Sequence, residues 1–231
     1  MRVPHIITID GPAASGKSTL GSRLAQAIGY LYFDTGVMYR AVTWVALERQ
    51  IDIVDEAAIT RLAELLTIDV REPSQPDGRA GDVLADGQDI SWEIRRPEVD
   101  ANVSPVSAYA GVRAALTAQQ RRIGLRGKVV MVGRDIGTVV LPEADLKIYL
   151  VASAQERARR RYTELLSRGE VADYEQILQV ILRRDQIDST REVAPLRAAA
   201  DAMVLDSDAL DADQVLQKVQ ALVNRMREAH E

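Results

Sequence analysis

Residues 6–19 read Ile-Ile-Thr-Ile-Asp-Gly-Pro-Ala-Ala-Ser-Gly-Lys-Ser-Thr, and this stretch decides the fold. It contains the pattern G-x-x-x-x-G-K-[ST] from Gly11 to Ser18. An apolar run typical of a buried strand precedes the pattern, and Leu20 and Ile28 follow it at helical spacing. Strand, glycine loop and helix together form an anion site from backbone N–H groups and the positive end of a helix dipole. The stretch therefore predicts a P-loop that binds a nucleoside triphosphate, with a ligand-free glycine turn as the alternative.

The residue types within the loop suggest how the phosphates are held. Lys17 should reach the β- and γ-phosphates, and Ser18 should help to hold Mg²⁺. The two glycines allow a turn tight enough for the backbone N–H groups to face phosphate. We expect the whole loop to contribute to binding: Gly11, Pro12, Ala13, Ala14, Ser15, Gly16, Lys17, Ser18 and Thr19.

Composition restricts the class of protein. The chain has 231 residues, of which 47% are apolar, so it can bury a substantial core as one domain with small appendages. Its 29 basic and 34 acidic residues give a net charge of −5, which does not favour a nucleic-acid or lipid-surface partner. With no cysteine, disulfides and thiolate metal sites are excluded. No signal peptide and no membrane-spanning run is evident, so we expect a cytoplasmic protein.

Strand and helix patterns alternate along the chain, which is typical of a parallel α/β sheet covered on both faces. After the first strand and helix, the pattern predicts strands over 30–33, 129–132, 146–151 and 202–205. It predicts helices over about 37–50, 56–66, 106–126, 154–167 and 174–188, and an amphipathic helix that closes the chain.

Residues 67–94 interrupt this alternation. Pro73, Pro76, Gly78, Gly81 and Gly87 fall between short alternating segments. We interpret these segments as two or three small antiparallel strands joined by tight turns. A long disordered loop is the alternative.

Two observations favour phosphoryl transfer over a hydrolytic switch. The guanine-reading pattern Asn-Lys-x-Asp is absent, since Asn102 and Asn224 are the only asparagines. Arginines also occur at predicted strand ends and helix starts, where ligands gather in open α/β sheets, and guanidinium groups stabilise a transferred phosphoryl.

Three groups of charged residues are candidates for that chemistry. Arg134-Asp135 follows the predicted strand 129–132, where Asp135 could order Mg²⁺ waters or accept a hydrogen bond from a substrate; an ion pair between neighbours is the alternative. Arg40 and the run 157–161 lie on predicted helices, and the alternative for both is a solvated helix face.

Four stretches in this order resemble the bacterial cytidylate kinases, a branch of the nucleoside monophosphate kinases. They are residues 9–19, residues 34–40 (Asp-Thr-Gly-Val-Met-Tyr-Arg), residues 133–140 and residues 191–196 (Arg-Glu-Val-Ala-Pro-Leu). Their spacing extends over the whole chain. The resemblance implies transfer of the γ-phosphoryl group of ATP to CMP or dCMP with Mg²⁺, giving ADP and CDP or dCDP.

The resemblance also implies an architecture. It is the three-layer α/β/α fold of P-loop NTPases, with a five-stranded parallel core sheet, a monophosphate-binding lobe with a small antiparallel insertion, and a short helical lid. Within a single domain spanning 1–231, the implied core covers about 1–36, 127–153 and 190–231. The lobe covers about 37–126 and the lid about 154–189, and the protein is expected to be a monomer.

Residue roles implied by the resemblance follow from the matching motifs. Catalysis would depend on Lys17, Arg40, Arg134 and Asp135, with Arg157, Arg160 and Arg161 as lid arginines. The acceptor phosphate would bind to Arg40 and Arg134, the cytosine to Thr35, Ser104, Arg113, Asp135 and Arg191, and the ribose to Arg184 and Asp188.

Two kinds of rival function stay open at the level of sequence. One is a kinase for another monophosphate or a small metabolite. The other is a binding protein whose P-loop hydrolyses ATP to switch partners, although the many arginines around an expected second-substrate site count against it.

Overall fold

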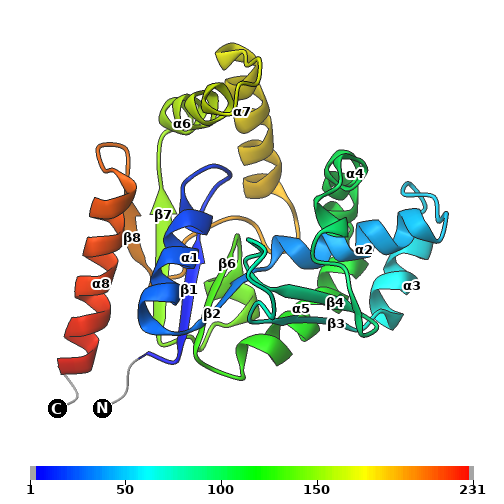
Figure 1. Cartoon of the computed structure of the whole chain (residues 1–231), viewed down its shortest axis with the longest axis horizontal. Helices are drawn as coiled ribbons and strands as arrows, with labels where there is room; N and C mark the ends of the chain where they lie inside the picture. Colours follow the sequence, from blue (N-terminus) through cyan, green and yellow to red (C-terminus); the bar gives the residue numbers. More distant parts are fainter. Residues whose placement is uncertain (1–3, 229–231) are drawn as a thin grey trace. The chain divides into compact units, whose positions relative to one another are not determined.

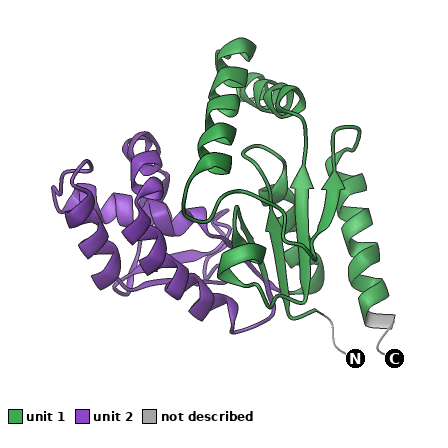
Figure 2. Ribbon diagram, turned by 180° about the vertical axis from the view of Figure 1, so that it is seen from behind, with its two compact units in different colours: residues 1–29, 130–231 green, residues 30–129 purple. Residues whose placement is uncertain are grey.

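The computed structural model describes residues 4–228 of the chain. The chain divides into two compact units (Figure 2). Unit 1 comprises residues 1–29 and 130–231, and unit 2 comprises residues 30–129. The first unit holds the P-loop, and the second holds the small antiparallel sheet.

The core sheet has five strands in the order β2-β6-β1-β7-β8. Their bounds are Leu31–Asp34 (β2), Val129–Gly133 (β6), Ile6–Asp10 (β1), Leu146–Val151 (β7) and Met203–Asp206 (β8). Strand β1 pairs in parallel with β7, with Asp10 opposite Tyr149, and β7 pairs in parallel with β8. Most apolar side chains of the central strands are buried, and Ile7 and Ile9 are fully buried. This confirms the parallel α/β class predicted from the alternating pattern and the five-stranded parallel core implied by the resemblance.

The helices of unit 1 follow its strands. They are α1 (Lys17–Ile28), α6 (Ala154–Ser167), α7 (Tyr174–Thr190) and α8 (Ala212–Glu228), together with η2 (Ile136–Val140), a single turn of π-helix. Helices α6 and α7 begin at side-chain caps, where Ser153 accepts a hydrogen bond from Glu156 N and Asp173 accepts one from Gln176 N. The two helices pack against each other beyond the carboxyl end of β7 (Figure 1).

Unit 2 is built around helices and a small antiparallel sheet. Its elements are α2 (Gly36–Glu48), α3 (Glu56–Leu65), β3 (Ile68–Arg71), β4 (Asp82–Ala85), β5 (Gln88–Asp89), η1 (Glu93–Arg95), α4 (Pro97–Ala108) and α5 (Ala110–Gly124). The order β3-β4-β5 confirms the predicted antiparallel insertion. Its turns are joined by Arg79, which forms ion pairs with Asp77, Asp82 and Asp89.

The single long helix predicted over 106–126 is wrong. The chain forms two helices that break at Tyr109, whose backbone is extended at φ −65° and ψ 123° and whose hydroxyl donates to Ile53 O. Helix α4 accommodates Pro97 in its first turn, where a missing N–H costs little, and it also contains Pro105. The two prolines and the weak amphipathic pattern of residues 97–108 hid this helix from a periodicity argument.

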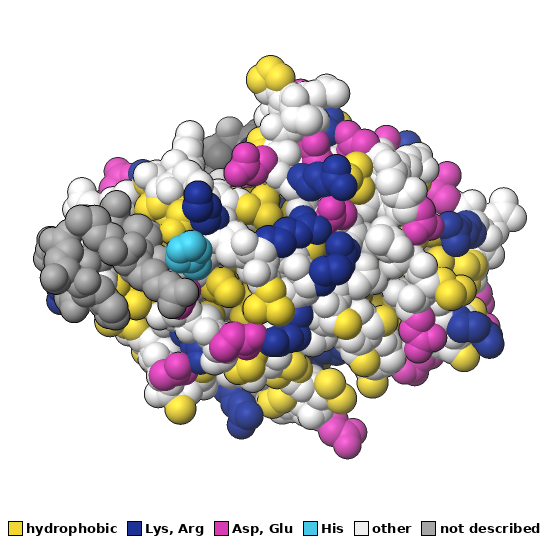
Figure 3. All heavy atoms as spheres, turned by 90° about the horizontal axis from the view of Figure 1, so that it is seen from below, with side chains coloured by type: hydrophobic (Ala, Val, Ile, Leu, Met, Phe, Trp, Pro, Cys, Tyr) yellow, Lys and Arg dark blue, Asp and Glu magenta, His cyan; other side chains and the backbone are white. Residues whose placement is uncertain are grey.

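Charged side chains of both signs share the molecular surface. On the face drawn in Figure 3, Lys and Arg side chains lie among Asp and Glu side chains. Among the described residues, no helix combines the length and apolar character that crossing a membrane requires.

Candidate active site

The P-loop of unit 1 connects β1 to α1 and packs against β7. A Cβ atom at Gly11 would lie 2.2 Å from Leu150 O, so only glycine fits this approach. Gly16 has φ 90° and directly precedes α1, where a side chain would be strained. Helix α1 begins directly after Gly16, so its first turn contains Lys17, Ser18 and Thr19. These residues lie at the positive end of the helix dipole.

Two side chains of the loop are buried where a phosphate chain would lie. The Lys17 ammonium is 7% exposed and donates to Pro12 O at 2.8 Å. The Ser15 hydroxyl is buried, and it has no hydrogen-bond partner among the described residues. Since a buried hydroxyl without a partner is costly, this group suits a ligand that supplies an acceptor.

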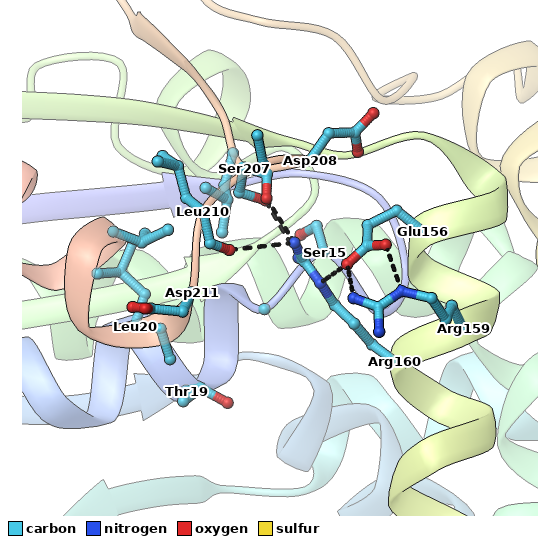
Figure 4. Close-up of a pocket in the computed structure, with 15 residues that line it drawn as sticks. Ser15, Thr19, Leu20, Glu156, Arg159, Arg160, Ser207, Asp208, Leu210 and Asp211 are labelled. Atoms are coloured by element: carbon cyan, nitrogen blue, oxygen red, sulfur yellow. Dashed lines mark hydrogen bonds and ion pairs between the residues drawn. The ribbon is translucent and has the colours of Figure 1, made fainter.

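A cavity of about 540 Å³ opens beside the P-loop (Figure 4). One side is formed by Ser15, Gly16 and Thr19, and the other by the segment 207–212, which connects β8 to α8. Sequence reasoning missed this segment, because it contains no recognisable motif and approaches the P-loop only through the fold. The cavity has the volume of a small-molecule site and adjoins the triphosphate loop.

Arg160 holds one wall of this cavity. Its guanidinium donates to Ser207 O at 2.5 Å, to Ser207 Oγ at 3.2 Å and to Leu210 O at 3.4 Å. The Nε atom donates to Glu156 Oε1 at 2.8 Å, and Figure 4 shows these bonds as dashed lines. Helix α6 is thereby tied to the β8–α8 segment.

The other two predicted lid arginines differ in their surroundings. Arg157 is 3% exposed and donates to Ala13 O of the P-loop, to Ala152 O and to both oxygens of Asp185 on α7. Arg161 is more exposed and pairs with Glu164. A second cavity, of about 260 Å³, is lined by Lys17, Ser18, Arg160 and Arg161, together with Ala14, Gly16, Thr19 and Glu164. The structure thus brings two of the lid arginines to the triphosphate loop, while Arg157 anchors α6 to the loop and to α7.

A cluster of alternating charges forms at the carboxyl end of β6. Arg134 Nε donates to Asp188 Oδ2 at 2.6 Å, and Arg191 donates to Asp135 Oδ1 at 3.1 Å. Arg191 also lies 3.8 Å from Asp188 Oδ1 and donates to Ala194 O at 2.6 Å. Arg134 therefore pairs with Asp188 of α7. Arg184 lies one helical turn before Asp188 on α7 and is exposed.

Two ionisable groups near this cluster have shifted pKa values. Burial raises the pKa of Asp10 to about 6, although the Gly137 and Ile136 amides and the Lys17 ammonium oppose the rise. Burial, with smaller contributions from Asp10 and Asp185, raises the pKa of Tyr149. Both groups lie at the carboxyl ends of paired strands, where open α/β sheets bind ligands.

Unit 2 holds the remaining predicted site residues. Thr35 is buried at the start of α2, and Arg40 on α2 pairs with Asp100 Oδ1 at 2.5 Å and donates to Ile94 O at 3.3 Å. Arg113 on α5 is buried and lies over the Tyr39 ring at 5.6 Å. Ser104 on α4 is exposed.

A small cavity within unit 2 adjoins Arg40. It measures about 130 Å³, and Tyr32, Asp34, Ser91 and Arg95 also line it. Arg95 was not among the predicted site residues, because nothing in its local pattern separates it from a solvated arginine. Its guanidinium lies 4.7 Å from the centre of the Trp92 ring, which fixes its direction.

Comparison with known proteins gives a consistent result. The family model "Cytidylate kinase" matches residues 7–225. Proteins called cytidylate kinase are 54% identical in Chloroflexus aggregans, over 91% of this chain and 90% of that protein, and 50% identical in Herpetosiphon aurantiacus, over 96% of both. Another from Roseiflexus castenholzii is 50% identical over 96% of this chain and 95% of its own length.

Proposed function

The chain belongs to the cytidylate kinase family, and from this premise we propose how its residues divide the work of the reaction. The enzyme transfers the γ-phosphoryl group of ATP to CMP or dCMP and releases ADP and CDP or dCDP. One observation supports this function above the others. Strands β1 and β6 are neighbours in the core sheet, and the P-loop follows β1. Arg134 and Asp135 follow β6 and pair with Asp188 and Arg191 from the end of α7.

We propose that ATP occupies the P-loop and the two cavities beside it. The triphosphate would lie on Gly11–Thr19 with Lys17 at the β- and γ-phosphates, and the nucleoside would fill the 540 Å³ cavity against segment 207–212. Hydrogen bonds from the loop amides and the Ser15 hydroxyl would hold the phosphates before any chemistry begins.

The residues present fit Mg²⁺ brought in by ATP. Within residues 4–228, no group of three or more His, Cys, Asp or Glu side chains could hold a metal ion by itself. Mg²⁺ commonly keeps several waters and binds through substrate phosphates with one or two protein oxygens, and the exposed Ser18 in the first turn of α1 provides such an oxygen. When bound, the metal neutralises negative charge on the phosphates.

We propose that residues from several elements bind the acceptor nucleotide. We assign its phosphate to Arg40 and Arg134. The cytosine is assigned to Thr35, Ser104, Arg113, Asp135 and Arg191, and the ribose to Arg184 and Asp188. The ion pairs Arg134–Asp188 and Arg191–Asp135 support this division, because they hold phosphate- and base-binding groups in defined directions before the ligand arrives.

The reaction needs no strong general base, because the attacking oxygen belongs to an anionic phosphate. Catalysis then consists of alignment, neutralisation of charge and exclusion of water. In this proposal residues 154–189 act as a lid that brings Arg160 and Arg161 to the transferred group, 37–126 form the acceptor lobe, and the rest is the core of a single domain. We further propose a monomer that works in the cytoplasm, where its nucleotide substrates are found.

A substrate panel tests the proposed function. Rates of ADP formation with CMP, dCMP, UMP, AMP and GMP should be highest with CMP or dCMP. A best rate with AMP would indicate a kinase for another monophosphate. ADP release that does not depend on any acceptor would indicate a hydrolytic switch. Size-exclusion chromatography with light scattering tests the monomer.

A further inference from the structure

The Asp10 carboxylate joins the end of β1 to the segment that follows β6. It is 4% exposed, and each of its oxygens accepts one backbone amide hydrogen. Ile136 N donates to Oδ1 at 2.8 Å, and Gly137 N donates to Oδ2 at 2.7 Å. Asp10 directly precedes the P-loop, so these two bonds connect the start of the loop to the segment after β6.

These two amides are the first of the π-turn η2. The turn closes through Val140 N to Asp135 O at 3.2 Å and Leu141 N to Ile136 O at 2.7 Å, so its first amides have no acceptor within the turn. Asp10 supplies both acceptors. At neutral pH a carboxylate with a pKa near 6 is largely ionised and acts only as an acceptor, which matches two amide donors.

The segment lies directly on β1 at this point. A Cβ atom at Gly137 would lie 3.0 Å from Thr8 Oγ1, 3.2 Å from Lys147 Cδ and 3.3 Å from Asp10 Oδ2. Contacts of this length are tighter than ordinary packing, so a larger residue would push the turn away from Asp10. Glycine at 137 and the carboxylate at 10 therefore fix the position of η2 together.

Arg134 and Asp135 precede these amides directly in the chain. Their side chains pair with Asp188 and Arg191, in the cluster assigned to the acceptor. We propose that Asp10 is a positioning residue: by holding the Ile136 and Gly137 amides, it sets the directions of Arg134 and Asp135 toward the acceptor nucleotide. The inference rests on the acceptor roles proposed for those two residues, and in it Asp10 acts through η2 and not by contact with a substrate.

Asp10→Asn is the direct test. Asparagine keeps one acceptor oxygen, but its NH₂ group replaces the other. Two N–H donors then face each other, so one hydrogen bond is lost and η2 shifts. The KM for CMP should rise about tenfold, while the KM for ATP should stay within about twofold. Isothermal titration with CMP alone should show the same loss of affinity.

Asp145→Asn provides a matched control. Asp145 also accepts two backbone amides, from His5 N at 2.8 Å and Ile6 N at 2.9 Å, but at the opposite end of β1. Both amides bond to Oδ2 of this exposed carboxylate, so the substitution removes the same charge at the other end of the strand without altering η2. Its KM values for both nucleotides should equal those of the wild type.

Gly137→Ala tests the same inference without changing any charge. The added methyl group should lift η2 from Asp10 and raise the KM for CMP selectively, by about threefold or more. If Asp10→Asn does not fold, this variant decides the question, with thermal unfolding as the check that it is folded.

The outcomes separate the inference from the function on which it rests. Equal rises in KM for ATP and CMP in Asp10→Asn, or an unchanged KM for CMP in both variants, would overturn the positioning role. Arg134→Lys and Asp135→Asn belong in the same panel. If those two leave CMP binding unchanged, the proposed acceptor site is wrong; if they weaken it while Asp10→Asn and Gly137→Ala do not, only the positioning inference is wrong.

Discussion

Lys17 is the first residue of α1, and its side chain is buried. Its ammonium donates to Pro12 O and is shielded from solvent, so its charge is available to the phosphates at low dielectric. Lys17→Ala should lower kcat by about 100- to 1,000-fold, because the charge serves the transition state more than the fold. Steady-state kinetics with circular dichroism as the folding control would check this. A change confined to KM for ATP would contradict it.

Arg191 contacts Asp135 and Asp188 in the charge cluster at the end of β6 and Ala194 in its own loop. Arg191→Met removes a cationic partner of Asp135 while keeping the length of the side chain. We expect the KM for CMP to rise by about tenfold or more, with the KM for ATP nearly unchanged. Equal losses for both nucleotides would show that the arginine supports the whole site instead of the acceptor.

Asp10 should also leave a signature in the pH dependence of stability. Burial raises its pKa from 3.8 to about 6, so the folded state binds its proton more tightly than the unfolded state. The free energy of unfolding therefore falls as the pH rises from about 4 to about 6, by about 3 kcal/mol from this group. Asp10→Asn lacks this loss, so its stability relative to the wild type should increase with pH. Urea unfolding at pH 4.5 and pH 7.5 measures the difference; a pH-independent difference is the contrary result.

Local motifs allow residues to be assigned from sequence, whereas contacts that the fold assembles between distant residues cannot be assigned in this way. Lys17 and Ser18 follow from spacing alone, because the P-loop is local. The hydrogen bonds from Arg160 to Ser207 and from the η2 amides to Asp10 join residues 47 to 127 positions apart. Such pairs depend on which strands become neighbours, and no local pattern records that choice.

At the scale of elements, Arg157 fastens helix α6. Its guanidinium is buried and bonded to Asp185 on α7 and to the P-loop. Arg157→Ala leaves Asp185 without this partner, so we expect a loss of about 3 kcal/mol in the free energy of unfolding and a thermal midpoint lower by roughly 5–10 °C. Calorimetry measures both.

Arg159→Ala is the control for that experiment. Arg159 lies on the same helix and pairs with Glu156, but its side chain is 64% exposed. Removing such an exposed pair should leave the free energy of unfolding nearly unchanged, because solvent screens it. Similar losses in the two variants would mean that helix propensity, and not the buried ion pair, decides the stability of α6.

Strands and helices differed in how well their patterns predicted them. Strand β7 and helix α6 occur within the predicted bounds, because a buried parallel strand and a strongly amphipathic helix have clear periodicities. Most of helix α4 was not predicted, and its last residues were joined to α5 in one predicted helix. The break between them lies at Tyr109, whose hydroxyl bonds to Ile53 O, far away in sequence. The π-turn η2 was not expected either, since its first amides are capped by Asp10 from another strand.

At the scale of the molecule, the residues proposed for the acceptor are spread along the chain, while the P-loop is one local segment. They are Thr35, Arg40, Ser104, Arg113, Arg134, Asp135, Arg184, Asp188 and Arg191. Under this proposed division of roles, full neutralisation of the transferred phosphoryl group requires groups that act only when the acceptor is bound. Water alone cannot recruit them, because it makes none of the contacts that the nucleotide makes.

This division predicts strict coupling between ATP cleavage and acceptor phosphorylation. Without CMP, ADP release should be at least about 100-fold slower than with saturating CMP. The proposed lid arginines and acceptor residues would then not stabilise the charge on the γ-phosphate. Arg191→Met should need more CMP to reach its maximal rate but should show the same slow basal hydrolysis as the wild type. A coupled assay for ADP, run with and without CMP, measures both rates. Hydrolysis as fast without CMP as with it would show that the P-loop unit completes the reaction alone, and the acceptor residues would then have no part in activating the donor.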